Sequence, residues 1–130
     1  MHEASEPMPV CAAMLTRIAT ASVDDRLDHV AGLFLSCGQD SIPVLEHGVP
    51  VGVLTRLDVV SGLTAGGPLA SVRAAPMRPV ITVTPSEPLD RVLAQLRGAP
   101  GAIAVVVDRG ATVGLLTAHA LSSYADRLRR

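Results

Sequence analysis

The sequence contains two copies of one pattern, set 62 positions apart. When residues 10–62 are placed on residues 72–124 without a gap, fourteen of the 53 aligned pairs are identical. The identical pairs include Thr20 with Thr82, Gly52 with Gly114 and Thr55 with Thr117. A repeat of this length gives each copy a whole supersecondary unit, which buries its apolar face against its twin. We call residues 10–62 the first repeat and residues 72–124 the second, and we expect a pseudo-twofold interface between them that forms two equivalent clefts.

The composition limits the partners that such a chain can take. The chain has 130 residues, 48% of them apolar, with one Phe, one Tyr and no Trp, and its net charge is −1. A chain of this length forms one domain, and its core must consist of Val, Leu, Ile and Ala. Proteins that bind single-stranded nucleic acid use several aromatic side chains and a basic surface. We therefore expect no nucleic-acid partner.

The reactive residue types also exclude several classes of site. All 11 basic residues are arginine, which excludes a Walker-type phosphate loop and a Schiff-base lysine. The spacing of the Ser, His, Cys and acidic residues does not suggest a catalytic site, although catalytic residues need not be close in sequence. Cys11 and Cys37 are the only cysteines and lack the spacing of metal ligands. We expect neither an enzyme nor a metal site.

The two cysteines and the N-terminal residues indicate the compartment. Two thiols fit a reducing compartment better than a disulfide framework. Glu3 and Glu6 stand where a signal peptide would be basic, and the longest aliphatic run, residues 102–107, is too short to span a membrane. We expect a cytoplasmic protein.

Each repeat shows the same order of secondary-structure signals, β-α-β-β-α. A β-prone run, Ile18–Ser22 or Val80–Thr84, leads to a helical apolar pattern that starts at Leu27 or Leu89. Two strands and a second helix are expected at Ser41–Glu46, Val51–Thr55 and Arg56–Leu63 in the first repeat, and at Ala102–Asp108, Thr112–Thr117 and Ala118–Leu128 in the second.

Turn and cap residues set the expected boundaries. Asp24 and Ser86 are candidate caps for the first helix of each repeat, and Gly38 and Gly98 mark where these helices end. The Gly and Pro content of residues 64–71 predicts a linker. We therefore expect residues 1–63 to form the first unit with an N-terminal arm, and residues 72–130 to form the second with a C-terminal helix.

The residues of the second and third strands carry a family resemblance. The run Ile42-Pro43-Val44-Leu45-Glu46, a glycine turn and the run Val51-Gly52-Val53-Leu54-Thr55-Arg56-Leu57-Asp58 resemble a cystathionine-β-synthase (CBS) domain. Two in tandem, over about residues 8–125, resemble a CBS pair, also called a Bateman module. The resemblance implies an α/β fold of two tandem CBS motifs, each β-α-β-β-α, related by a pseudo-twofold axis. It also implies a stand-alone regulatory module, without catalysis of its own, that acts on a separate effector protein and pairs into a homodimer.

The resemblance further implies an adenosine-containing ligand: AMP, ADP, ATP, S-adenosylmethionine or NAD. In the family, a Gly-x-x-Thr/Ser-x-x-Asp pattern directs a hydroxyl toward the phosphate and an acid toward the ribose, and Gly52, Thr55 and Asp58 fit it. One carboxylate can accept hydrogen bonds from both of the vicinal hydroxyls of a ribose. The free N–H groups and the positive dipole end of a helix N-terminus favour a phosphate. The ligand is regulatory, and we expect no resident cofactor.

The same comparison nominates the other ligand-binding residues. They are Thr20 and Thr82 on the adenine side, Ile42 and Pro43 of the motif, Arg56 beside the phosphate, Thr117 as the second hydroxyl, and His119. Each has a plain structural alternative. Asp58 could serve only the dipole of its helix, and Thr55 could be a strand end or a helix N-cap. The other threonines could be ordinary strand or turn residues, and Arg56 and His119 could be surface side chains.

The two copies differ at the acid. Ala120 stands at the position equivalent to Asp58, so the second repeat keeps the hydroxyl of Thr117 without a ribose acceptor. We therefore expect one standard nucleotide site per chain, around Thr55 and Asp58, and a second cleft that is empty, weak or adapted to something else. A ligand-free dimerisation or protein-interaction domain with degenerate clefts is the alternative function.

Overall fold

The computed structural model describes residues 8–128, apart from the side chains of residues 118–120 and 123. Each repeat contains a short 3-10 turn and the expected β-α-β-β-α order. In the first repeat the elements are the 3-10 turn Val10–Ala12, β1 (Ala21–Ser22), α1 (Leu27–Cys37), β2 (Ser41–Glu46), β3 (Val49–Thr55) and α2 (Arg56–Gly66). In the second they are the 3-10 turn Val72–Ala74, β4 (Val80–Val83), α3 (Leu89–Arg97), β5 (Ile103–Asp108), β6 (Ala111–Leu116) and α4 (Ala118–Leu128).

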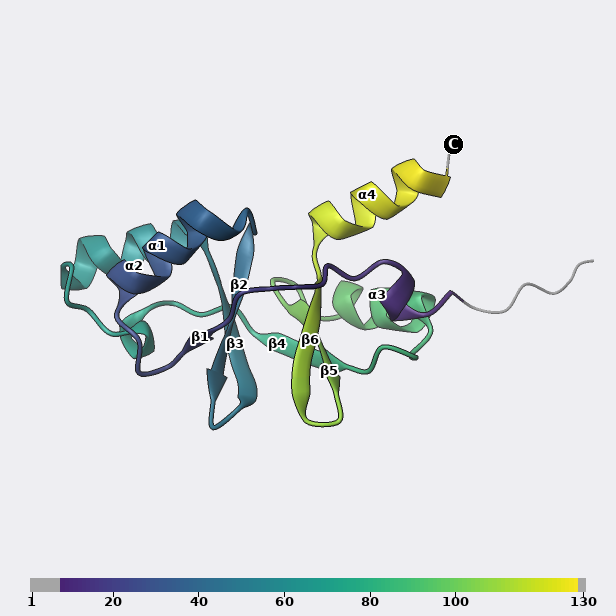
Figure 1. Cartoon of the computed structure of the whole chain (residues 1–130), viewed down its shortest axis with the longest axis horizontal. Coiled ribbons are helices and arrows are strands. Elements are labelled where there is room, and N and C mark those ends of the chain that lie inside the picture. Colours follow the sequence, from purple (N-terminus) through teal and green to yellow (C-terminus); the bar gives the residue numbers. More distant parts are fainter. Residues whose placement is uncertain (1–7, 129–130) are drawn as a thin grey trace, which may run out of the picture.

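The strands form two three-stranded sheets with the same topology. β2 pairs in parallel with β1 and antiparallel with β3, and β5 pairs in parallel with β4 and antiparallel with β6. Both hairpins turn through a residue and a glycine with positive φ, at His47-Gly48 and Arg109-Gly110, which suits a tight two-residue hairpin turn. The two hairpins lie side by side, with their turns at the same end of the molecule (Figure 1). The mixed α/β fold expected from the repeat is confirmed.

The buried side chains divide among three apolar clusters. Leu54 and Leu116, which are equivalent, lie in separate clusters that each pack between one sheet and its helices. The preceding residues, Val53 and Leu115, point to the opposite faces of the strands and join Val105 in a third cluster between the sheets. The alternation along β3 and β6 therefore gives each repeat its own core and also packs the repeats together.

The segments that precede β1 and β4 exchange partners between the repeats. Val10, at the start of the first repeat, is buried in the core of the second, while Val72, at the start of the second, is buried in the core of the first. We call residues 10–20 and 72–79 the leading segments. Figure 1 shows the first of them crossing from one half of the molecule to the other. Each repeat therefore needs its neighbour to complete its core.

Backbone hydrogen bonds hold each leading segment to the far sheet. The N–H of Leu15 donates to the carbonyl of Leu115 at 2.7 Å, and the N–H of Arg78 donates to the carbonyl of Val53 at 2.8 Å. Glycine is required on the strands at these crossings. A Cβ at Gly114 would lie 2.8 Å from the Leu15 carbonyl oxygen, which explains why this glycine is repeated in β3, at Gly52, where Met77 lies equally close.

The crossings also correct the ungapped alignment of the repeats. Val53 and Leu115 are 62 positions apart, but their partners Arg78 and Leu15 are 63 apart. The offset returns to 62 at the sheets, where Ala21 pairs with Val44 and Val83 pairs with Val106. Arg17, which has a positive φ of 56°, lies within this stretch of the first leading segment. Within the leading segments, Arg78 is therefore equivalent to Leu15 and not to Thr16.

The helix ends agree only in part with the expectation from the sequence. Gly38 and Gly98 cap the C-termini of α1 and α3 as expected. Asp24 and Ser86 do not cap these helices, because the N-cap positions are Arg26 and Pro88, without a side-chain cap bond. α2 continues to Gly66, three residues into the stretch that composition assigns to the linker, and β1 is limited to two residues, since the residues before it belong to the crossing.

The last helix differs from its counterpart. α1 and α2 lie together on one side of their sheet, whereas α4 extends away from the second repeat above α3 (Figure 1). Leu121 and Tyr124 of α4 pack on the second core, and the Arg127 guanidinium donates to the Ala12 carbonyl at 3.2 Å. Within residues 8–128, no helix has the length and apolar character needed to cross a membrane.

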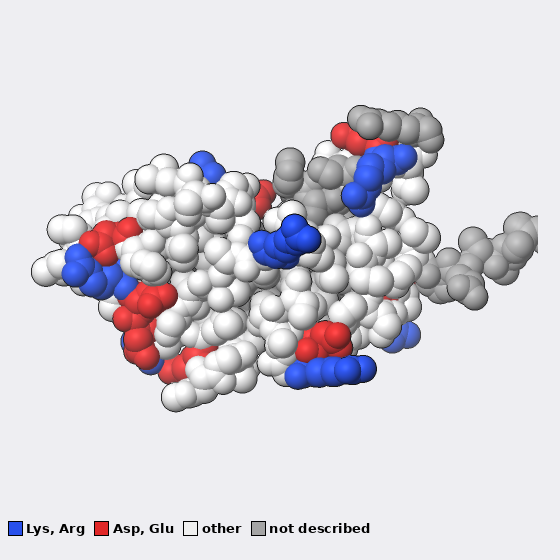
Figure 2. Space-filling model, in the orientation of Figure 1, with Lys and Arg blue, Asp and Glu red and all other residues white. Residues whose placement is uncertain are grey.

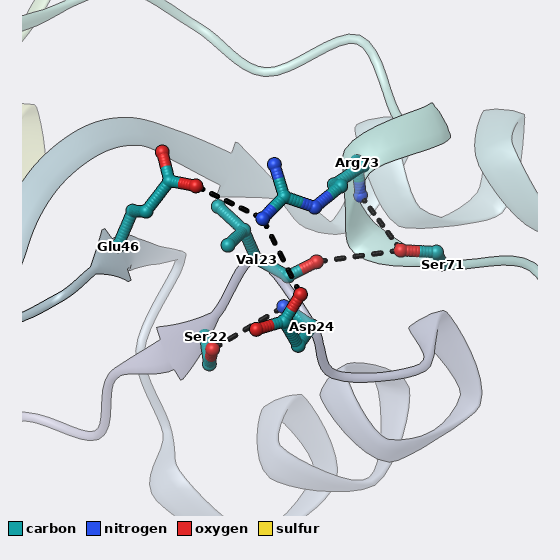
Figure 3. Close-up of polar contacts among 6 residues, drawn as sticks. All are labelled: Ser22, Val23, Asp24, Glu46, Ser71 and Arg73. Carbon is teal, nitrogen blue, oxygen red and sulfur yellow. Dashed lines mark hydrogen bonds and ion pairs between the residues drawn. The ribbon is translucent and has the colours of Figure 1, made fainter.

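Charged side chains are sparse over the face drawn in Figure 2, where they form small groups and no continuous basic stripe. A group of polar contacts ties the second leading segment to the first repeat (Figure 3). The Arg73 guanidinium donates to Glu46 at 2.9 Å and to Asp24 at 3.3 Å, and the Ser71 hydroxyl donates to the carbonyl of Val23 at 3.3 Å. Because Arg73 and Asp24 are largely exposed, this group adds little stability.

Candidate ligand-binding cleft

A cavity of about 490 Å³ lies between the two repeats. Thr55 and Thr117, which are equivalent residues at the ends of β3 and β6, both line it. The remaining lining residues come from the start of β2, the start of β5, the end of β6, and helices α3 and α4: Asp40, Ser41, Leu93, Leu96, Arg97, Ala102, Ile103, Leu116 and Leu121. The volume is within the range of pockets that bind small molecules. The walls are mostly apolar, with polar groups at the strand ends.

The first turn of α2 is built around a reciprocal cap. Thr55 is the N-cap residue, and its hydroxyl oxygen accepts from the Asp58 N–H at 3.3 Å. The Asp58 carboxylate in turn accepts from the Thr55 N–H at 3.0 Å and from the Thr55 hydroxyl at 2.8 Å. This capping box satisfies two of the N–H groups that a helix N-terminus leaves without a partner. The Thr55 hydroxyl therefore points its hydrogen at Asp58.

An arginine of the second leading segment completes the surroundings of Asp58. Arg78 donates through Nε to Oδ2 of Asp58 at 3.1 Å and through Nη2 to Oδ1 at 3.3 Å. The Asp58 side chain is only 7% exposed, while that of Arg78 is 40% exposed. The backbone pairing with Val53 fixes the position of Arg78. The acid that the resemblance assigns to ribose therefore already holds an intramolecular partner.

The environment keeps the Asp58 carboxylate ionised. Burial by itself raises the pKa of Asp58, but the hydrogen bonds from Arg78 and from the backbone and hydroxyl of Thr55 outweigh it, so the pKa lies below its ordinary value of 3.8. Each of these donors favours the charged form. The first repeat thus presents a buried carboxylate at the helix N-terminus, balanced by one guanidinium.

The acid and the arginine change together between the repeats. At the positions equivalent to Asp58 and Arg78, the other half of the molecule has Ala120 and Leu15. An isolated buried acid is costly, and neither half contains one partner without the other. The asymmetry that the sequence shows at position 120 is therefore an asymmetry of an ion pair.

Ile42 and Pro43 are buried and do not line the cleft. Ile42 is fully buried in the first core, and Pro43 is buried opposite Val53 on the face that meets the other sheet. Asp40 and Ser41, which precede them, line the cavity instead.

The remaining nominated residues are dispersed. Thr20 is exposed, and Thr82 is exposed beside a separate cavity of about 400 Å³ that the two hairpin turns line. Arg56 lies over the Phe34 ring, 5.6 Å from its centroid, and donates to the carbonyls of Phe34 and Gln39 at 3.4 Å. The side chain of His119 is outside the described part of the chain.

Arg78, the partner of Asp58, and two residues that line the cleft escape the sequence pattern. Arg78 lies outside the motif, and the ungapped alignment pairs it with Thr16, which hides its relation to Leu15. Leu93 and Leu96 belong to the apolar stripe of α3 and read as core residues. They line the cavity because α4 does not cover α3 in the way that α2 covers α1 (Figure 1).

Comparison with solved structures finds the same fold elsewhere. A hemolysin-like protein containing a CBS domain, from Oenococcus oeni PSU, is 18% identical with a TM-score of 0.78, covering 91% of this chain and 90% of its own. The CBS domain pair of protein MJ0100, solved with 5′-methylthioadenosine and S-adenosyl-L-methionine, is 21% identical with a TM-score of 0.77, covering 95% and 99%. CBSX2, solved with AMP, is 19% identical with a TM-score of 0.72, covering 94% and 98%.

At these identities, the structural likeness establishes the fold alone. No curated protein matched the chain in sequence. The sequence profile of the CBS domain matches twice, over residues 10–65 and 72–126. These two ranges coincide with the two repeats and take up most of the chain, so the chain belongs to the CBS domain family as a tandem pair.

Proposed function

We propose that this chain is a regulatory module that binds an adenosine-containing ligand between its two CBS motifs and acts on a separate effector protein. The observation that carries the proposal is the cavity of about 490 Å³ on which Thr55 and Thr117 converge. MJ0100 and CBSX2, which share the fold, were solved with S-adenosyl-L-methionine, 5′-methylthioadenosine or AMP. Ile103 of β5 and Ala102, which precedes it, offer an apolar wall for an adenine.

Asp58 is the proposed ribose acceptor. It stands in the first turn of α2, three residues after Thr55, and it accepts a hydrogen bond from the hydroxyl of Thr55, which lines the cavity. Its carboxylate is ionised at neutral pH, because its pKa is lowered by Arg78 and Thr55 against the effect of burial. A charge-assisted hydrogen bond contributes about 1.5–3 kcal/mol, so a ribose hydroxyl that reaches this carboxylate is held firmly.

Calorimetric titration of AMP, ATP and S-adenosylmethionine into the purified protein tests the proposal. We expect one binding event per chain, and we expect Asp58→Ala to weaken it about 10- to 150-fold. Asp90→Ala is the matched control, since Asp90 is an exposed acid in the first turn of α3, away from the cap and the ion pair at α2. Absence of binding to wild type at millimolar ligand would refute the proposal.

A second function has its own supporting observation. The carboxylate of Asp58 is already satisfied within the chain by Thr55 and Arg78, as it would be in a domain that only associates with other proteins or with a second copy of itself. A thermal-shift screen separates the two functions, because a ligand present at 100 times its dissociation constant adds about 2.7 kcal/mol of stability.

A further inference from the structure

We propose that Arg78 is a displaceable latch on Asp58 that makes the cleft selective for phosphorylated adenosine ligands. The inference rests on the proposed function and specifies the chemistry of its ligand. When a ribose takes the carboxylate of Asp58, the guanidinium of Arg78 is released and pairs with the phosphate of the same ligand.

The geometry makes ribose and Arg78 competitors for one carboxylate. Oδ2 of Asp58 already accepts from the Thr55 N–H, the Thr55 hydroxyl and Nε of Arg78, while Oδ1 accepts from Nη2 of Arg78. The two Thr55 bonds belong to the helix cap, so they stay as long as α2 is intact. With the side chain only 7% exposed, a pair of ribose hydroxyls reaches the carboxylate by replacing the guanidinium.

The guanidinium is able to leave but not to travel far. The Arg78 side chain is 40% exposed, and partly exposed ion pairs are weak because water solvates the separated charges. The backbone of Arg78 is fixed by two hydrogen bonds with Val53, of 2.8 and 3.1 Å. The released side chain therefore swings about a fixed Cα at the edge of the first repeat, close to the carboxylate that it has left.

The charge balance favours an anionic ligand. In the structure, Asp58 and Arg78 neutralise each other. A ribose is uncharged, so a nucleoside that replaces Arg78 breaks an ion pair and leaves its cation without an anion. A phosphate restores the lost partner, and arginine binds phosphate through two parallel hydrogen bonds. Arg56 does not serve instead, since its guanidinium donates to the Phe34 and Gln39 carbonyls.

Within the described part of the chain, the pair of an acid and an arginine at a CBS helix N-terminus belongs to the site at α2. The equivalent positions in the other half are Leu15 and Ala120, which offer neither the carboxylate nor the guanidinium. The latch and the phosphate contact are therefore specific to the site at α2, and we expect one phosphorylated ligand per chain.

Titrating AMP and adenosine, which differ only by the phosphate, tests the latch. We expect wild type to bind AMP about tenfold more tightly than adenosine, because one charge-assisted hydrogen bond between Arg78 and the phosphate contributes that factor. Arg78→Leu, which installs the residue found at position 15, should bind adenosine more tightly than wild type does, and its AMP preference should fall about tenfold. Arg78→Lys should keep part of the preference. Arg73→Leu removes the other ion-paired arginine of the same segment and should match wild type.

Three results would count against the latch in distinguishable ways. If wild type binds AMP but Arg78→Leu and Arg78→Lys both keep the full preference, the latch is wrong and the proposed function stands. The same conclusion follows if wild type binds adenosine as tightly as AMP. If neither wild type nor Arg78→Leu binds either compound, both proposals fall. If wild type binds AMP and Arg78→Leu binds adenosine more tightly than wild type does, the latch is supported, because its removal has opened the site.

Discussion

The pair formed by Asp58 and Arg78 gives a quantitative prediction for folding stability. Asp58→Ala places at position 58 the residue found at 120, and it removes both the cap of α2 and the acceptor for Arg78. Loss of a side-chain cap costs about 1 kcal/mol. The ion pair adds about 1–2 kcal/mol, a value reduced for the 40% exposure of Arg78. We expect a total loss of about 2–3 kcal/mol, or roughly 10 °C in Tm for a chain of this size.

A double-mutant cycle isolates the pair. Arg78→Leu alone leaves Asp58 buried with only Thr55 as a donor, and we expect it to cost about 1–2 kcal/mol. The double variant installs the Ala and Leu combination that Ala120 and Leu15 form in the other half of the molecule, so its cost should be smaller than the sum of the single costs by about 1–2 kcal/mol.

Urea unfolding followed by circular dichroism measures each variant, since the chain has no Trp and one Tyr for fluorescence. Asp28→Ala is the control, because Asp28 is an exposed acid in the first turn of α1 that pairs with Arg26, and it should change stability little. If the single costs add to within about 0.5 kcal/mol, Asp58 and Arg78 are not energetically coupled and the reasoning is refuted.

Three further predictions test the fold and the state of Asp58. Gly114→Ala should destabilise the protein by about 1–3 kcal/mol, because its Cβ would meet the Leu15 carbonyl oxygen at 2.8 Å. Gly32→Ala, in open space on α1, should stabilise it by about 0.5–1 kcal/mol. Chemical denaturation measures the unfolding free energy of both variants, and a change of the same sign in both would contradict the close crossing at Gly114. Val10→Ala should lower the unfolding free energy by about 2 kcal/mol. Because Val10 is buried in the second core, it should also lower the amide exchange protection of β5 and β6. A loss of protection confined to β2 and β3 would contradict this placement of Val10. The folded pKa of Asp58 lies below its ordinary 3.8, so its stabilisation is fully present above that pH and disappears as the pH falls through the folded value. The stability difference between wild type and Asp58→Asn, measured by urea unfolding from pH 6 to 2.5, should therefore shrink toward acid, and a difference that grows would overturn the assignment.

The local features of the fold could be predicted from the sequence because they depend on neighbouring residues. The β-α-β-β-α order follows from apolar periodicity, and the hairpin turns follow from His47-Gly48 and Arg109-Gly110. The extent of α4, Ala118–Leu128, is confirmed as predicted. The prediction that Asp24 and Ser86 cap the first helices was wrong, because the turns before α1 and α3 use other carboxylates. Asp25 accepts from the N–H of Ser22, and Glu87 accepts from the N–H of Thr84.

The exchange of leading segments could not be predicted, since it depends on contacts between distant residues. Val10 and Val72 look like apolar residues of their own repeats, and nothing local shows that each fills the core of the other. The partner of Asp58 was missed for the same reason. Arg78 is 20 residues away in sequence and reaches Asp58 only because its segment crosses to β3. The role of Thr55 in a capping box was among the alternatives that the sequence left open.

The central claim is that a phosphorylated adenosine ligand replaces Arg78 on Asp58. A crystal structure of the complex with AMP measures this directly. We expect the ribose hydroxyls within hydrogen-bond distance of the Asp58 carboxylate, and the Arg78 guanidinium moved from its present 3.1 Å contact with Oδ2 onto the phosphate. If AMP is bound elsewhere while Arg78 remains on Asp58, or if the ribose lies on Asp58 with Arg78 unmoved, the claim is contradicted.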